Sequence, residues 1–166
     1  LAPKKYGGQE KDTLSYIIAV EELARVDSSQ AATVVAHNSL GLVPIIDYGT
    51  NEQKEKYLPQ LTTGEKLWGF GLTEENAGSD ARGTETTAIR DDDEWIINGS
   101  KRYITNASTP LTLGVTLQVM TDNDNGHPQL TTLLVENGTP GYKATRMLGK
   151  MMWRAADTAH LQFDNC

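Results

Sequence analysis

The sequence predicts an α+β protein in which N-terminal helices are followed by an antiparallel β-barrel or sandwich domain. Apolar residues recur at helical spacing through the first third of the chain, whereas short β-branched segments divided by turn residues begin at Leu67. Such segments, recurring roughly every 8–12 residues, are typical of all-β barrels and sandwiches. The change falls near Gly64, so we expect residues 1–64 to belong to a helical domain and residues 65–166 to form a β domain.

Three helices are expected before this change. Each begins at a polar residue whose side chain can accept a hydrogen bond from the first turn, and each continues with apolar residues at helical spacing. The second helix should kink or end at Pro44, because proline lacks the backbone N–H that the helix needs. The second helix is expected to start at Ser28 or Ser29. The expected cap residues are Asp12 for the first helix and Thr50, in a capping box with Gln53, for the third.

Seven strands are expected after the helices. Asp91-Asp92-Asp93 and Asn98-Gly99 predict hairpins, and Asn-Gly is the stronger signal because a type I′ turn needs positive φ at both central residues. Thr139-Pro140-Gly141 predicts another turn, and residues 122–128 predict a polar loop. The expected strands are residues 67–73, 84–90, 94–98, 101–105, 111–121, 129–136 and 157–163.

Composition limits the partners of the chain. The 15 basic and 22 acidic residues give a net charge of −7, which argues against nucleic acid or an anionic membrane as the main partner. No apolar run approaches the roughly 20 residues that span a bilayer, and no residues show metal-ligand spacing. The single cysteine, Cys166, cannot form an internal disulfide, which favours a reducing compartment. Because the chain begins without Met and stops directly after a strand-like segment, we expect a fragment of a larger protein.

Two short runs carry the residues of greatest chemical interest. They read F-G-L-T-E-E-N-A-G-S-D, which contains Thr73, and N-G-S-K-R-Y-I-T-N-A, which contains Thr105. Each places a hydroxyl or backbone donor just past a strand, beside an aromatic ring, so together they can grip a flat heterocycle with polar edges. The alternative is an ordinary polar turn and a core aromatic, and composition alone favours that alternative. The hypothesis requires Thr73 and Thr105 to lie on one side of the molecule, within the breadth of such a ring.

The two runs resemble the flavin-binding segments of the acyl-CoA dehydrogenase family, which commonly read F-x-L-T-E-P-x-A-G-S-D and N-G-x-K-x-[WY]-I-T-N-A. The resemblance extends over nearly the whole chain, from Tyr6-Gly7-Gly8 to Phe163. It implies that residues 1–64 are the end of the N-terminal helical domain and residues 65–166 the flavin-binding middle domain, while the C-terminal helical domain lies outside this sequence.

The resemblance also implies an FAD site. Leu72 and Thr73 would contact the pyrimidine edge of the flavin, Thr105 would hydrogen-bond near N5, and Ser79 would also meet the pantetheine end of the substrate. Asp80 is expected to hold its own turn by local hydrogen bonds, and Lys101 to be a structural surface cation. The flavin-binding residues implied are Phe70, Leu72, Thr73, Gly78, Ser79, Tyr103, Ile104 and Thr105.

The activity implied is α,β-dehydrogenation of an acyl-CoA thioester, in which a carboxylate base takes the α-proton and the β-hydride passes to flavin N5. In the family that base lies in the C-terminal domain, so no catalytic residue is assigned here, and Glu74, Glu75 and Glu85 are not expected to replace it. The isolated chain should show no turnover and should bind FAD with micromolar or weaker affinity, about −8 kcal/mol at best. An electron-transfer flavoprotein is the implied partner, a homodimer or homotetramer the implied assembly, and the bacterial cytoplasm or mitochondrial matrix the implied location.

Three departures from the family pattern keep alternatives open. Glu75 stands where the family usually has proline, Met152 where it usually has glycine, and Ala156 where it often has serine. The first leaves its turn less rigid and adds a negative charge near the cofactor. An acyl-CoA oxidase or nitroalkane-type oxidase on the same scaffold is one alternative, and a binding module that kept the fold and lost the chemistry is another.

Overall fold

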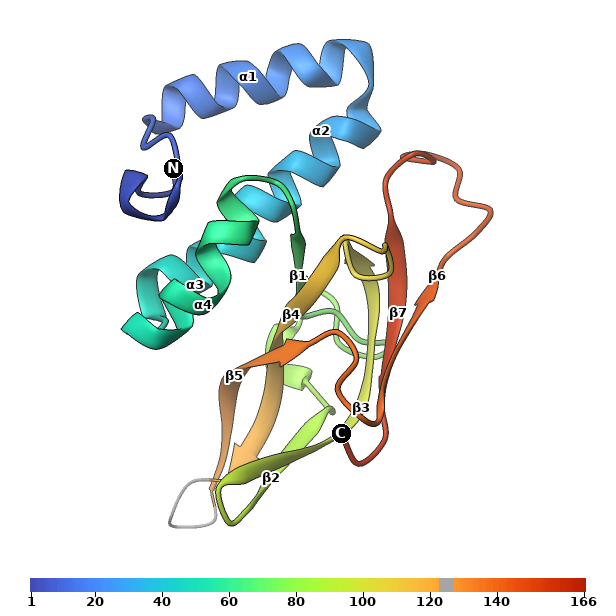
Figure 1. The fold of residues 1–166 in the computed structure, drawn as a ribbon. Coiled ribbons are helices and arrows are strands. Elements are labelled where there is room, and N and C mark those ends of the chain that lie inside the picture. The colour runs from blue at the N-terminus through green and yellow to red at the C-terminus, as the bar shows by residue number, and fades with distance from the viewer. Residues whose placement is uncertain (123–126) are drawn as a thin grey trace.

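The computed structural model describes residues 1–122 and 127–166, and it places the helices that precede the first strand to one side of the strands (Figure 1). The predicted order, helices first and a β domain after them, is confirmed. The helices are η1 (Lys4–Tyr6), α1 (Thr13–Val26), α2 (Ser28–Val35), the π-helical turn η2 (Ala36–Gly41), α3 (Leu42–Tyr48), α4 (Asn51–Thr62) and η3 (Ala81–Gly83). The strands are β1 (Leu67–Gly71), β2 (Thr87–Asp91), β3 (Glu94–Thr105), β4 (Thr112–Asp122), β5 (Pro128–Glu136), β6 (Tyr142–Arg146) and β7 (Thr158–Phe163).

Side-chain caps fix the starts of the longer helices. The Asp12 carboxylate accepts a hydrogen bond from the first turn of α1, as predicted. Thr50 and Gln53 form both bonds of the predicted capping box at the start of α4. The second helix starts at Ser28, as predicted, and is capped by Asp27, whose carboxylate accepts a hydrogen bond from the backbone N–H of Ser29 at 2.7 Å.

The helical path continues past Pro44. The hydrogen bonding changes just before it, in η2, where the backbone N–H of Leu42 donates to the carbonyl of His37, five residues earlier. Pro44 is the third residue of α3, directly after this π-helical turn, so the change in hydrogen bonding coincides with the residue that has no N–H to donate.

The strands form one open, mixed sheet. Their order is β1-β4-β2-β3-β7-β6, and β5 lies off this path and pairs with β4. The sheet does not close into a barrel. The β1–β4 and β2–β4 pairings are parallel, so the expectation of a purely antiparallel sheet is wrong. A tight turn fixes an antiparallel direction only for the two strands that it joins, whereas β1 and β4 are separated by the whole β2–β3 hairpin. Residues 123–126, in the predicted loop 122–128, lie outside the described part of the chain.

The predicted hairpin at Asn98-Gly99 is wrong, because residues 94–105 form one continuous strand. The first half of β3 pairs with β2 and the second half with β7, so the strand passes from one part of the sheet to the other at Gly99. Gly99 has φ +142°, and a Cβ there would lie 2.7 Å from the Cα of Thr86. The glycine thus serves a close backbone approach rather than a turn. The other predicted hairpin, at residues 91–94, joins β2 to β3.

Strand β6 was missed by the sequence interpretation, although the turn before it was predicted. The backbone N–H of Tyr142 donates to the carbonyl of Thr139 at 3.0 Å, and Gly141 has φ +79°, as the third residue of a type II turn requires. The strand itself, Y-K-A-T-R, lies at the edge of the sheet and is mostly exposed. It therefore lacks the apolar alternation by which a half-buried strand is recognised.

Two hydrophobic clusters meet at β1. One fills the β domain and includes Val115, Leu117 and Leu161; the other lies between the helices and β1 and is centred on the fully buried Trp68. The indole Nε1–H of Trp68 donates to the hydroxyl of Thr116 on β4 at 2.9 Å. This bond links Trp68 of the helix-side cluster to β4, the strand that carries Val115 and Leu117 of the other cluster. In the described residues, no helix is long and apolar enough to cross a membrane.

His37 joins the helices to the start of β1. The backbone N–H of Trp68 lies 3.2 Å from His37 Nδ1, and His37 Nε2 lies 2.9 Å from the carbonyl oxygen of Leu61. Since a backbone N–H can only donate and a carbonyl can only accept, the imidazole is neutral with its proton on Nε2. Burial lowers the pKa of His37 and so favours this neutral form.

Candidate functional site

The predicted cofactor residues lie where the chain leaves β1 and runs beside the second half of β3. The backbone N–H of Arg102 donates to the carbonyl of Thr73 at 2.7 Å. At the other end, a Cβ on Gly69 would lie 3.1 Å from the carbonyl oxygen of Thr105. Thr73 is therefore next to Arg102, and Thr105 follows three residues further along β3, at most about 10 Å from Arg102, the reach of three extended residues. The two threonines are not on opposite sides of the molecule.

The hydroxyls in this region are uncommitted. Within residues 1–122 and 127–166, the side-chain hydroxyls of Thr73, Ser79 and Thr105 make no hydrogen bond to another protein group. Ser79 and its neighbour Gly78 are exposed, and the space that a Cβ on Gly78 would enter is open. These groups can therefore donate to the edge of a bound heterocycle without breaking a bond inside the protein.

A bulge in β3 directs the side chains of Tyr103 and Ile104 to opposite sides. The pairing with β7 is irregular between Lys101 and Ile104, and Tyr103 has φ +62°. Ile104 is buried in the core of the β domain, so only its backbone can meet a ligand. Tyr103 is 58% exposed, and its ring lies 6.2 Å from that of His160. The bulge thus presents an aromatic face to solvent one residue before the core resumes.

Phe70 lies on a different cavity. It is half-buried on β1 and lines a space of about 450 Å³ between the helices and β5, together with Ile45, Tyr48 and Leu133. Leu72 is also half-buried, and its carbonyl accepts a hydrogen bond from Lys101. The structure therefore places Thr73 beside the segment of β3 that carries Tyr103 and Thr105, whereas Phe70 faces the helices from β1.

Lys101 is not a surface cation, and that prediction is wrong. Its side chain is fully buried, and its ammonium lies 2.6 Å from the Glu74 carboxylate, which is itself 4% exposed. A signal for this was present in the sequence, because alternation from Ile97 through Gly99 puts residue 101 on the inward face of its strand. A lysine at an inward position needs a buried acidic partner, and the T-E-E run supplies one.

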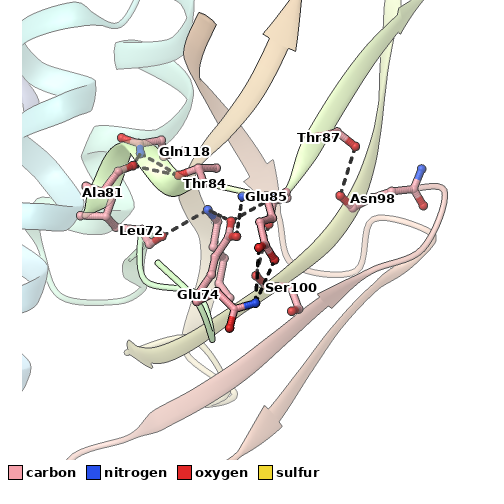
Figure 2. A network of polar contacts seen from close by, with 12 residues as sticks. Leu72, Glu74, Ala81, Thr84, Glu85, Thr87, Asn98, Ser100 and Gln118 are labelled. Atoms are coloured by element: carbon pink, nitrogen blue, oxygen red, sulfur yellow. Dashed lines mark hydrogen bonds and ion pairs between the residues drawn. The ribbon is translucent and has the colours of Figure 1, made fainter. Parts of the chain in front are cut away.

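Glu74 is held as a carboxylate. It accepts hydrogen bonds from the backbone N–H groups of Glu85 at 2.6 Å and Thr86 at 3.1 Å, in addition to the Lys101 ammonium (Figure 2). Burial by itself raises the pKa of Glu74, but the hydrogen bonds from Lys101 and Thr86 outweigh it, and the pKa lies below its usual value. With its oxygens engaged in this way, Glu74 is not available as a general base.

Further contacts fix the surroundings of the two threonines. Asp80 holds its own turn, as predicted, by accepting a hydrogen bond from the backbone N–H of Arg82 at 3.2 Å. Directly after Thr105, the buried Asn106 has φ +63° and donates through Nδ2 to the carbonyl of Thr33 on α2 at 3.0 Å. This side-chain bond, which the sequence did not reveal, ties the end of β3 to the helices.

No residues offer a metal site in the part of the chain that the structure describes, since no three His, Cys, Asp or Glu side chains come together there. The chemistry of the region is that of hydroxyls, backbone donors and one exposed aromatic ring. Such a donor set suits an uncharged, polar-edged ring system better than a cation.

The fold and these segments define an acyl-CoA dehydrogenase scaffold. Residues 1–65 match the family model of the acyl-CoA dehydrogenase N-terminal domain, and residues 69–166 match that of the middle domain. The chain therefore belongs to the acyl-CoA dehydrogenase family, as the sequence analysis had predicted.

Individual relatives agree with this assignment. The chain is 44% identical over 163 residues to a probable acyl-CoA dehydrogenase of Bacillus subtilis, which covers 98% of the chain and 43% of the relative. The structure of butyryl-CoA dehydrogenase from Megasphaera elsdenii is similar with a TM-score of 0.88 and 42% identity, over 98% of this chain and 43% of that one. A glutaryl-CoA dehydrogenase from Mycobacterium smegmatis in complex with FADH2 is similar with a TM-score of 0.91 and 36% identity, over 99% of this chain and 40% of that one. The chain thus spans less than half the length of the relatives that it matches.

Proposed function

We propose that this chain supplies the flavin-binding part of an FAD-dependent acyl-CoA dehydrogenase. The observation that carries the proposal is the pair of uncommitted hydroxyls on Thr73 and Thr105, which lie where β1 leaves the sheet beside β3, with the exposed Ser79 in the loop that follows. Family membership supports the same cofactor, because a structurally similar relative is described with FADH2 bound.

Each residue has a stated task in this proposal. Thr73 and Thr105 donate hydrogen bonds to the polar edge of the flavin, and Tyr103 covers part of the ring system with its exposed face. Ser79 meets both the cofactor and the pantetheine of the substrate, and the open space at Gly78 lets the backbone approach them. When bound, FAD supplies the hydride-accepting chemistry of α,β-dehydrogenation.

The base that takes the α-proton lies outside these residues in our proposal. Glu74 is buried and committed to three donors, as described above. Glu75 is paired with Arg102 at 2.9 Å, and Glu85 is exposed and accepts a hydrogen bond from Asn76. All three carboxylates are thus engaged by donors within the protein, whereas a general base needs an oxygen within reach of the substrate proton.

The wider assignment follows from the family. We propose an acyl-CoA thioester as substrate, an electron-transfer flavoprotein as electron acceptor and a homodimer or homotetramer as the assembly, in the bacterial cytoplasm or the mitochondrial matrix. The net charge of −7 supports partners other than nucleic acid.

The test uses the protein produced from the whole reading frame that encodes these residues. We expect a yellow protein with a flavin spectrum, which bleaches when a short-chain acyl-CoA is added without oxygen. Turnover should need an electron-transfer flavoprotein; rapid oxygen consumption in its place would assign an oxidase. A colourless protein that takes up no FAD would overturn the proposal and favour a binding module without redox chemistry.

A matched pair of variants tests the site itself. Thr105→Val and Thr73→Val remove the donating hydroxyls with little change of shape, and each should weaken FAD binding roughly tenfold, the loss of about one hydrogen bond to the ring. Thr145→Val, on the exposed edge strand β6, is the control and should bind FAD like the unaltered protein. Equal FAD affinity in all three variants would remove the threonines from the site.

A further inference from the structure

We propose that Glu74 and Lys101 are positioning residues that hold Thr73 in the orientation its flavin contact needs, and that Glu75 with Arg102 adds an outer ion pair to the same clamp. The inference rests on the proposed flavin site. Neither pair touches the reacting atoms; both act by fixing the three-residue turn formed by Leu72, Thr73 and Glu74.

The buried pair of Glu74 and Lys101, here called the inner pair, contacts the chain on both sides of Thr73. The Lys101 ammonium contacts the Glu74 carboxylate at 2.6 Å and donates to the carbonyl of Leu72 at 3.2 Å. Between them, the carbonyl of Thr73 accepts a hydrogen bond from the backbone N–H of Arg102 at 2.7 Å. Two consecutive residues of β3 therefore hold three consecutive residues of the turn, and the Thr73 side chain is left free.

The Glu74 carboxylate extends the clamp to a third segment. Its oxygens accept hydrogen bonds from the backbone of Glu85 and Thr86, just before β2, while Leu72 lies on the other side of the network (Figure 2). The turn is thus tied to both β3 and the entry of β2. Because a buried ion pair is usually no more stabilising than an apolar pair of equal size, its presence is better explained by the position that it enforces than by stability.

The outer pair lies directly beside the inner one. Arg102 Nη2 is 2.9 Å from the Glu75 carboxylate, and the two side chains are 35% and 64% exposed. Glu75 occupies the position where the similar family segments carry proline, so an ion pair stands in place of a rigid ring. Such an exposed pair is screened by salt, whereas proline would restrict the turn at any ionic strength.

The first experiment removes the inner pair without leaving a buried charge. The double variant Glu74→Gln/Lys101→Met is made in the whole protein and compared with Lys56→Met/Glu136→Gln, which removes another Lys–Glu pair, between α4 and β5. We expect the inner-pair variant to exchange the amides of Thr86 and Glu85 at least about tenfold faster and to bind FAD roughly tenfold more weakly. The control should leave both quantities unchanged. Equal amide exchange and equal FAD affinity in both variants would overturn the inference.

The two readouts separate this inference from the function on which it rests. If the unaltered protein takes up no FAD, the flavin proposal fails, while amide exchange still decides whether the pair fixes the turn. If the unaltered protein binds FAD and the inner-pair variant loses amide protection but keeps its affinity, the clamp exists but does not position Thr73, and the inference fails.

The second experiment uses surface substitutions that leave the core intact. Arg102→Gln should weaken FAD binding about threefold at low salt, and the difference from the unaltered protein should vanish at about 1 M salt. In a Glu75→Pro background the same substitution should have no effect, because the ring then restricts the turn. An Arg102→Gln effect that persists in high salt, or in the Glu75→Pro background, would overturn the role of the outer pair.

Discussion

The two ends of strand β1 are held by different chemistry. Its start is held by hydrogen bonds between neutral groups: His37 bridges Trp68 and Leu61, and the Trp68 indole donates to Thr116. Just beyond its end, charged groups do so, through the buried pair of Glu74 and Lys101. The neutral end joins two hydrophobic clusters and serves the fold, whereas the charged end holds a turn at the proposed cofactor site. The comparison predicts that substitutions at the two ends respond differently to pH and to salt.

The largest effect is expected from breaking the charged end on one side only. Lys101→Met leaves the Glu74 carboxylate buried without its counter-ion, so it should lower the free energy of unfolding by about 3–5 kcal/mol. Adding Glu74→Gln removes the orphaned charge and should restore most of the loss. Urea denaturation of the two variants measures both quantities. A single variant as stable as the double variant would mean that the pair is not a coupled unit.

At the neutral end, Trp68→Phe removes the indole N–H that Thr116 accepts and leaves a small void. We expect a loss of about 1–3 kcal/mol in the free energy of unfolding, independent of ionic strength. Trp95→Phe is the control, since Trp95 is 38% exposed on the β2–β3 hairpin and its substitution should change stability by less than about 0.5 kcal/mol. Equal losses of unfolding free energy in the two variants would show that the Trp68–Thr116 hydrogen bond adds no measurable stability.

Acid should act through His37. Because burial lowers its pKa in the folded state, the unfolded chain binds the proton more readily. This contribution to stability is complete above the ordinary histidine pKa of about 6.5 and is lost as pH falls from there toward the folded-state pKa, by up to about 1.4 kcal/mol per pH unit. His37→Gln should reduce that slope in thermal melts recorded from pH 7.5 to 5. An unchanged slope would place the pH dependence elsewhere.

The smallest effect is expected at the outer pair. Arg102→Gln should change the free energy of unfolding by less than about 1 kcal/mol, and only at low salt, because Glu75 is exposed and Arg102 is only half-buried. Melting temperatures with and without added salt measure it. A large, salt-independent loss would mean that Arg102 supports the structure by packing rather than by charge.

The parts of the fold that depend on neighbouring residues could be predicted from the sequence. Asp12 and the Thr50–Gln53 capping box act within one turn of a helix, so their positions alone specify the helix starts. The parallel pairing of β1 with β4 could not be predicted in this way, because the partner strand is distant in sequence. Asn98-Gly99 was misleading for the same reason, since the need for glycine comes from Thr86 across the sheet.

The candidate site divides in the same manner. Thr73 and Thr105 could be identified because each lies at or just past the end of a strand within a recognisable run, and the structure places Thr73 beside the second half of β3, which ends at Thr105. Alternation from Ile97 puts Lys101 on the inward face of β3, but its burial was missed because its acidic partner Glu74 lies 27 residues earlier in the chain. The roles of Thr73 and Thr105 in flavin binding are predictions, which the FAD titrations of their valine variants test.

The passage of β3 from one part of the sheet to the other also sets an order of events during folding. Its first half needs only the β2 hairpin next to it in sequence, whereas its second half must wait for β7, close to Cys166. Contacts between residues so distant in sequence form slowly, because a long loop has to close first. The segment from Gly99 to Thr105 should therefore gain protection late in refolding, after the hairpin half of the same strand, so the proposed cofactor edge is completed only when nearly the whole chain is in place.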